Sequence, residues 1–170
     1  LAELLTNELG VKSFITFCTS ELSVENILFY QEIEFYRKHK QKIFQEDYDM
    51  LYLLQLAQNI NSKYIIDYAP VQITHITSPV NKELKHLIQR LTQIIQQKNY
   101  AELSELQSSG ALNEYDKTTI TNETPTIFDH AQKDVFDEMN DSWPRYLHSD
   151  YYHDLMNHLA AEKIKLQING

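Results

Sequence analysis

The chain of 170 residues has the length of one ordinary domain, and its 42% hydrophobic and 23% charged residues are typical of soluble globular proteins. Its net charge of −9 would repel the phosphates of nucleic acids, so we expect no nucleic-acid binding. The single cysteine, Cys18, excludes an internal disulfide and suits a reducing compartment. No apolar run approaches the roughly 20 residues that span a bilayer, so we expect no direct membrane insertion.

The composition favours an all-α fold. The chain has 3 glycines and 4 prolines, whereas a β fold with many tight turns needs residues that adopt positive φ at regular intervals. No Asn-Gly or Asp-Gly pair lies between alternating apolar and polar residues to indicate a hairpin. We therefore expect helices throughout a single domain, residues 1–170.

Apolar residues recur at helical spacing from the start of the chain. Residues 1–9 predict a short helix that Gly10 ends as a C-cap glycine. Residues 14–18 predict a second helix, which a polar break separates from the next one. Ser23 predicts the N-cap of that next helix, over residues 24–36.

The middle of the chain predicts two longer helices and an insertion. Residues 47–64 continue one apolar face until Pro70 prevents a longer helix. Ser78 and Pro79 predict a cap and a first-turn proline for a helix that reaches residue 95. Residues 96–122 are too long for an ordinary connection, so we interpret them as an insertion with a short helix over residues 100–106.

Two helices are predicted in the last third. Thr126 and Asp129 have the spacing of a capping box, and a buried face continues to Met139. Residues 140–144, which end in Pro144, predict a break. A last helix follows through residues 151–159.

The sequence gives no indication of a metal site or of catalytic machinery. His148, His153 and His158 are spaced by five, which places successive side chains on different faces of a helix. Asp154 and His158 have i, i+4 spacing, which we interpret as a surface hydrogen bond rather than a pair of metal ligands. No nucleophile motif or phosphate-binding glycine loop is present, so we expect no metal, no cofactor and no catalytic residue.

Two polar clusters interrupt otherwise apolar patterns. In residues 20–26, capping explains Ser23 and Glu25, but it does not explain Asn26, a poor helix former in a helix's first turn. In residues 141–147, Asp141 and Arg145 are spaced i, i+4 and are expected to pair. The two clusters predict a polar patch that binds a partner protein.

Four short sequence motifs around these clusters, taken together and in their order along the chain, resemble the regulator of G-protein signalling (RGS) domain family. The likeness covers most of the chain, and Tyr30 stands where the family frequently has Trp. The first motif comprises Gly10, Phe14, Phe17, Ser20-Glu21 and Glu25-Asn26-Ile27. The other three are Thr124-Pro125-Thr126, Phe128-Asp129-His130-Ala131-Gln132 and Asp141-Ser142-Trp143-Pro144-Arg145-Tyr146-Leu147-His148-Ser149.

The resemblance implies a bundle of about nine helices that binds the α subunit of a heterotrimeric G protein in its GTP or transition-state form. It implies acceleration of GTP hydrolysis by the α subunit, and cytoplasmic action at the plasma membrane, to which other parts of the parent protein recruit the domain. By position, the resemblance implies that Leu22, Ser23, Glu25 and Asn26 contact the switch regions of the α subunit. It also implies that Asp141 accepts a backbone amide of a switch loop and that Arg145 braces Asp141.

Three departures from the family pattern leave an alternative open. Where the family commonly has Asn near the catalytic glutamine of the α subunit, counting from Ala69 gives Thr74 and counting back from Ser78 gives His75. Glu138 stands near a typically apolar contact position, and residues 139–141 are one residue shorter than usual. The alternative is an RGS-like scaffold that binds an α subunit, or another protein, without accelerating hydrolysis.

Overall fold

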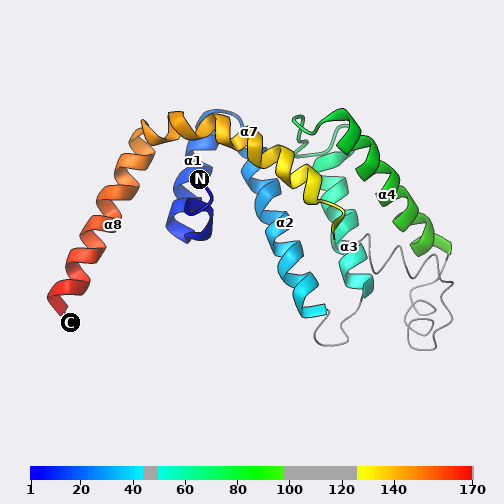
Figure 1. Ribbon diagram of the computed structural model, residues 1–170, viewed down its shortest axis with the longest axis horizontal. Coiled ribbons are helices and arrows are strands. Elements are labelled where there is room, and N and C mark those ends of the chain that lie inside the picture. The colour runs from blue at the N-terminus through cyan, green and yellow to red at the C-terminus, as the bar shows by residue number, and fades with distance from the viewer. Residues whose placement is uncertain (44–49, 98–125, 170) are drawn as a thin grey trace. The chain divides into compact units, whose positions relative to one another are not determined.

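The computed structural model describes residues 1–43, 50–97 and 126–169 (Figure 1). Every regular element in these ranges is helical, which confirms the all-α prediction. None of the helices in these ranges has the length and apolarity to cross a membrane. Apart from the end of α4, the predicted insertion lies outside the described residues, as does its predicted helix over residues 100–106. The elements are η1 (Leu4–Thr6), α1 (Glu8–Ser20), α2 (Val24–Ile43), α3 (Met50–Ile60), η2 (Asn61–Ile65), α4 (Ser78–Gln97), α7 (Asp129–Leu147) and α8 (Asp150–Asn169).

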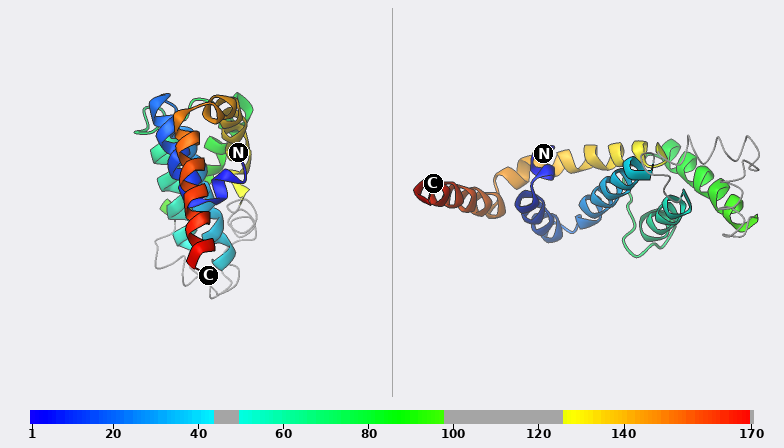
Figure 2. Two further views of the ribbon diagram at one scale, coloured as in Figure 1. Left: turned by 90° about the vertical axis from the view of Figure 1, so that its left-hand side faces the viewer. Right: turned by 90° about the horizontal axis from the view of Figure 1, so that it is seen from below.

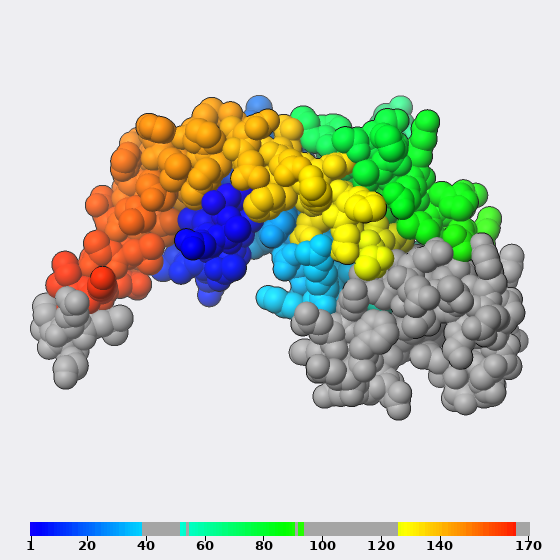
Figure 3. All heavy atoms as spheres, viewed as in Figure 1, coloured from blue at the N-terminus to red at the C-terminus, as the bar shows by residue number. Residues whose placement is uncertain are grey.

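The chain forms two compact units. The first consists of residues 1–28 and 136–170, and the second of residues 29–135. In the first unit α1 packs against η1 and α8, and the atoms of α8 meet those of α1 in Figure 3. In the second unit α3 and α4 lie side by side (Figures 1 and 2).

An aromatic cluster around Tyr146 forms the core of the first unit. The Tyr146 side chain is fully buried, and its ring lies edge-on to Phe14 and Phe17 of α1, with centroids 5.1 and 5.4 Å away. Trp143 and Tyr152 add rings at 5.5 Å. The Tyr146 hydroxyl donates a hydrogen bond to Ser13 Oγ at 2.9 Å, so the one polar atom of this side chain is satisfied.

The N-terminal prediction was wrong about Gly10. Residues 4–6 form a 3₁₀ helix, and α1 begins afterwards at Glu8, with the Asn7 side chain accepting the Gly10 amide at 3.0 Å as its N-cap. Gly10 therefore lies in the first turn of a helix instead of ending one. A Cβ on Gly10 would lie 2.8 Å from the carbonyl oxygen of Leu4, so glycine is needed here for close packing rather than for a positive φ.

The second unit is built around a chain of edge-on aromatic rings. Phe29 contacts Tyr64 and Phe128, and Phe128 contacts Tyr36. All four side chains are at most 1% exposed. At the edge of this core Arg37 of α2 pairs with Asp129 of α7 at 2.8 Å.

Two helix starts in the second unit differ by one or two residues from the predictions. The residue before α4 is Thr77 rather than Ser78, and its amide and hydroxyl both donate to Asp134 of α7, at 2.9 and 2.8 Å. Helix α7 begins at Asp129, so Thr126 lies too early to cap it. The predicted helix over residues 47–64 is also divided, since α3 ends at Ile60 and continues as the π-helix η2.

The break predicted at residues 140–144 is absent, because α7 runs through Pro144 to Leu147. A proline inside a helix removes one amide donor and crowds the preceding turn. Pro144 lies near the end of α7, where few hydrogen bonds are affected, and the continuous helix buries Tyr146 completely. The break comes after Leu147, where Ser149 accepts the Tyr152 amide at the start of α8.

Candidate partner-binding site

The loop between α1 and α2 has a defined backbone geometry. The Ser23 amide donates to the Cys18 carbonyl at 2.9 Å and the Leu22 amide to the Thr19 carbonyl at 3.2 Å. These two bonds form the Schellman motif, which ends a helix with one residue in the left-handed region. That residue is Leu22, with φ of 56°, and its side chain is 89% exposed. The loop therefore holds a large apolar side chain in solvent, on a backbone conformation that favours glycine.

Leu22→Gly is expected to raise the free energy of unfolding by about 1 kcal/mol. Leucine at positive φ places its Cβ too close to the following carbonyl, which costs roughly 1–2 kcal/mol, and the exposed side chain makes little packing to lose. Urea denaturation of the two proteins measures the difference. Leu22→Ala keeps the Cβ and should show no such gain in stability. An equal gain for both variants would show that the Cβ at positive φ does not strain the backbone.

Arg145 of α7 holds this loop. Its guanidinium donates to the Glu21 carboxylate through Nη2 at 2.7 Å and through Nε at 3.1 Å. Its Nη1 donates to the carbonyl of Asp141 at 3.0 Å, and Nη2 also reaches Ser142 Oγ at 3.1 Å. The hydrogen bond from Arg145 lowers the pKa of the Glu21 carboxyl, so the pair is charged at neutral pH. The guanidinium thus connects the residue before Leu22 with the last turns of α7.

Glu138, Asp141 and Arg145 form one stripe along α7. Their spacing of three and four residues places them on the same side of the helix. Asp141 and Arg145 are exposed, and Glu138 is half-buried. The expected pairing of Asp141 with Arg145 uses the Asp141 backbone carbonyl, which leaves the Asp141 carboxylate exposed on the same stripe.

Asn26 lies beneath the surface of this patch, in the first turns of α2. Its side chain is 4% exposed, and within the described part of the chain its Oδ1 has no hydrogen-bond partner. An unsatisfied buried acceptor costs about 1–3 kcal/mol, so the fold does not explain an asparagine at this position. Glu25 beside it is half-buried, in the helix turn where an acid is favoured.

Thr74 and His75 belong to the second unit. Both are exposed on the loop of residues 66–77, which precedes α4. The loop is anchored on η2, because the Val71 and Ile73 amides donate to the Lys63 and Tyr64 carbonyls at 3.1 and 3.0 Å. The first unit therefore holds seven of the nine predicted contact residues and does not hold these two.

The family model of the regulator of G protein signaling domain matches residues 1–155. The chain belongs to the RGS family. It is 29% identical over 169 residues to regulator of G-protein signaling 1 from Mus musculus, with 97% of this chain and 59% of that protein covered. It is 27% identical over 157 residues to regulator of G-protein signaling 5 from Sus scrofa, with 92% of this chain and 64% of that protein covered. The RGS chain thus spans about three fifths of the length of these relatives.

Glu21 and Ser142 were not among the contact residues that the sequence predicted for this RGS chain. In the structure they determine where the Arg145 side chain lies. Glu21 is 124 residues from Arg145 in the sequence, so helical spacing could not connect them. The available signal was local, since Glu21 directly precedes the predicted contact residues Leu22 and Ser23.

The thiol of Cys18 lies below the same RGS loop and is not a reactive nucleophile. The side chain is 1% exposed, and burial raises the pKa of the thiol to about 11. The loop contributes to this burial, because both the amide and the hydroxyl of Ser23 bond the Cys18 carbonyl. Cys18 therefore acts as a small apolar residue of the core.

At pH 8, alkylation of Cys18 by iodoacetamide is expected to be at least about a hundred times slower in the folded RGS domain than in urea. The thiolate is the reactive form, and a pKa of about 11 instead of 9.0 reduces its fraction about a hundredfold, before the shielding by burial is counted. Mass spectrometry of timed, quenched samples gives both rates. Equal rates in the two conditions would show that the loop does not protect the thiol.

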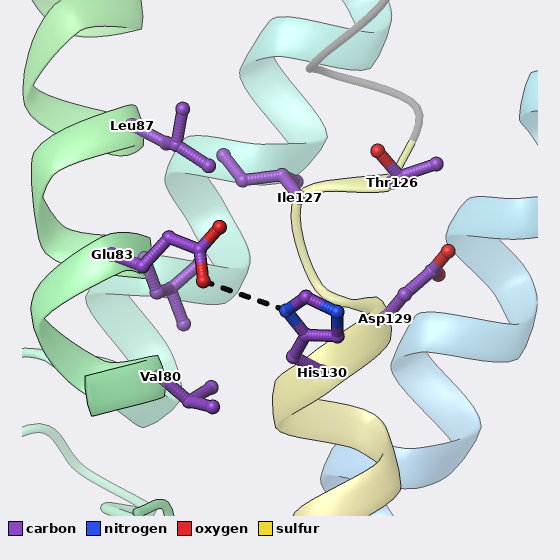
Figure 4. Close-up of a pocket in the computed structure, with 8 residues that line it drawn as sticks. Val80, Glu83, Leu87, Thr126, Ile127, Asp129 and His130 are labelled. Carbon is purple, nitrogen blue, oxygen red and sulfur yellow. Dashed lines mark ion pairs between the residues drawn. The ribbon is translucent and has the colours of Figure 1, made fainter. Parts of the chain in front are cut away.

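A surface groove of about 530 Å³ lies in the second unit (Figure 4). Apolar residues from α4 and Ile127 line it, and Glu83 pairs with His130 across it at 3.5 Å. Both partners of this pair are more than half exposed, and Asp129 is engaged by Arg37. These are features of a solvated groove rather than of an enclosed catalytic pocket. In the described ranges, no three His, Cys, Asp or Glu side chains are placed to hold a metal ion.

Proposed function

We propose that this RGS domain is a GTPase activator for the α subunit of heterotrimeric G proteins. Its role is to bind the switch regions of the α subunit and to stabilise them in the transition-state geometry for GTP hydrolysis. The observation that carries the proposal is the Arg145–Glu21 pair, which joins the exposed Leu22 loop to the Asp141 stripe of α7. Family membership and the names of the relatives, both regulators of G-protein signaling, support the same partner.

The proposed mechanism requires no catalytic group from this chain. A Gα subunit carries its arginine in cis and a glutamine that orients the attacking water. Hydrolysis is limited by how well these groups and the mobile switches are positioned, so a partner that holds the switches accelerates the reaction. The domain is thus an activator of an enzyme, with neither an active site nor a cofactor of its own.

Each residue of the patch has a proposed role. Leu22 offers apolar surface at the tip of the loop, and Ser23 and Glu25 offer polar contacts beside it. Asn26 offers an acceptor that lacks a partner within the described chain. Asp141 offers an exposed carboxylate to a backbone amide of a switch loop.

The patch is already rigid in the free chain, which favours tight binding. The Schellman motif fixes the loop, and Nη2 and Nε of Arg145 hold the loop to α7 through Glu21. The Nη1 group fixes the Arg145 side chain to the Asp141 carbonyl of its own helix. Ordering a mobile side chain on binding costs about 0.5–1.5 kcal/mol, and the bonds of Arg145 and Glu21 reduce this cost for these two side chains. The Arg145–Glu21 pair itself is exposed, so its main contribution is to position the loop rather than to stabilise the fold.

Binding without acceleration is the second candidate function, and Thr74 and His75 are the observation that favours it. Both are exposed on the loop before α4, where the family resemblance expects an asparagine. A threonine hydroxyl offers one donor and has shorter reach than the two donors of an amide. Half-buried Glu138 adds a negative charge to the α7 stripe, near a contact position that is typically apolar in the family.

Single-turnover GTP hydrolysis by purified α subunits of each class, with and without the domain, tests the proposal. Acceleration of at least one class is the expected result. Capture of an activated α subunit without faster hydrolysis would select the binding-only function. Neither acceleration nor binding with any class would refute both.

The family model of the RGS domain matches residues 1–155, which include parts of both compact units. This supports one RGS domain over most of the chain. We therefore propose that residues 1–170 form a single RGS domain.

A further inference from the structure

The loop before α4 carries a second exposed side chain on a strained backbone. Tyr68 has φ of 65°, and 98% of its side chain is exposed. Among the described residues, Leu22 and Tyr68 are the two non-glycine residues with positive φ, and both hold a large apolar side chain almost entirely in water. Leu22 belongs to the proposed interface, and Tyr68 lies six residues before Thr74.

The conformation of Tyr68 is maintained by its surroundings. Its amide donates to the Gln72 side chain at 3.1 Å, and the amide of the next residue, Ala69, donates to the Ile66 carbonyl at 3.1 Å. Ala69 is buried, and the carboxylate of Asp67 pairs with Lys85 of α4 at 3.2 Å. Tyr68 is therefore presented by an ordered turn.

These bonds hold the backbone of Tyr68, but the ring itself remains in water. The left-handed conformation costs roughly 1–2 kcal/mol for a residue with a Cβ, and an aromatic ring left in water forgoes the roughly 1.5–3 kcal/mol typical of burying a large apolar side chain. Strained residues persist where the surroundings impose them, and they are concentrated at binding sites. The missing compensation is available from contact with a partner.

We propose that Tyr68, on the loop before α4, is an apolar anchor for the α subunit. The inference rests on the proposed function, because Thr74 and His75, two of the residues predicted to contact the α subunit, lie on the same loop. Tyrosine is among the residues that dominate binding energy when a partner buries them. The turn already fixes the backbone of Tyr68, so binding has to order only the side chain.

The surroundings of Tyr68 have the composition of an interface. Ile66, two residues before it, is 42% exposed and adds apolar surface. Ile66 also lines a hollow of about 320 Å³ that offers a recess for a partner side chain, and the paired charges of Asp67 and Lys85 line the same hollow. Protein–protein contacts commonly combine apolar side chains with polar and charged ones. The residues that line the hollow are Asn61, Ile66, Asp67, Lys85, Ile88 and Gln89.

Affinity for α subunits in the GDP–aluminium fluoride form, measured by calorimetry or surface plasmon resonance, tests the inference. Tyr68→Gly should weaken binding at least tenfold, while the midpoint of thermal unfolding stays the same or rises because the strain is relieved. Tyr68→Phe keeps the ring and should bind within about threefold of the unchanged domain. Met156→Ala removes an apolar side chain of α8 that is 46% exposed, and it should leave affinity unchanged.

Two failures are distinguishable in this experiment. If the unchanged domain binds an α subunit and Tyr68→Gly binds it equally well, the anchor is refuted and the proposed function remains. If the unchanged domain binds no α subunit of any class, the proposed function fails and the anchor fails with it. A loss of affinity that accompanies a lower unfolding midpoint would also overturn the anchor, because it would show that Tyr68 supports the fold.

Discussion

Asn26→Ala and Asp141→Ala are each expected to reduce the acceleration of GTP hydrolysis by a factor of about 30 or more. Central contacts of an interface cost about 2 kcal/mol or more when truncated, which corresponds to this factor. Asp141 is exposed, and Asn26 has an acceptor without a partner inside the described chain, so neither truncation breaks a known hydrogen bond of the fold through these atoms. The two variants should therefore lose activity while keeping most of their stability.

Single-turnover hydrolysis at several domain concentrations, with urea denaturation of the same samples, measures both effects. Asp154→Ala is the matched control, because it removes an exposed aspartate from α8, away from the proposed contact residues. The control should accelerate hydrolysis as well as the unchanged domain. If all three variants behave alike, the assignment of the patch is wrong even if the domain is an activator.

Tyr146→Ala is expected to destabilise the first unit by about 3–5 kcal/mol. Truncating a fully buried aromatic residue removes its transfer free energy and leaves a cavity. The cavity would lie among the rings that pack against Tyr146, which are those of Phe14, Phe17, Trp143 and Tyr152. Domains typically have about 5–15 kcal/mol of stability in total, so this change would leave a substantial unfolded fraction.

Tyr146→Phe separates packing from hydrogen bonding. It keeps the ring and removes the hydroxyl that donates to Ser13 at 2.9 Å, so we expect a loss of about 1 kcal/mol. Urea denaturation followed by tryptophan fluorescence reports on both variants, because Trp143 lies against Tyr146. If alanine costs no more than phenylalanine, the aromatic cluster is not the core of this unit.

Helical periodicity predicted most elements of the fold but failed where one residue type serves two purposes. Gly10 suggested a helix end, yet its role is to let the Leu4 carbonyl approach the helix, and no local pattern distinguishes these uses. Pro144 suggested a break, yet the burial of Tyr146 outweighs one missing amide near the helix end. In both cases a tertiary contact overrides a local preference.

The candidate site could be predicted only in part, for a similar reason. Its members are polar residues that disturb apolar patterns, so Asn26 and Asp141 were visible in the sequence. The Glu21–Arg145 bond was not, because a pair 124 residues apart leaves no periodic trace in a single sequence. The positive φ of Leu22 was equally hidden, because leucine rarely adopts it and nothing in its sequence context indicates it.

The first unit joins the two ends of the chain, which determines when it can form during synthesis. Its bonds Glu21–Arg145 and Ser13–Tyr151 close loops of 124 and 138 residues. Closing a flexible loop of this length carries a length-dependent entropy cost of about 4 kcal/mol, which later contacts must offset. A ribosome must therefore release α7 and α8 before the surface around Leu22 acquires its shape. A prematurely terminated chain that lacks α7 therefore also lacks the Arg145 side chain that holds the Leu22 loop.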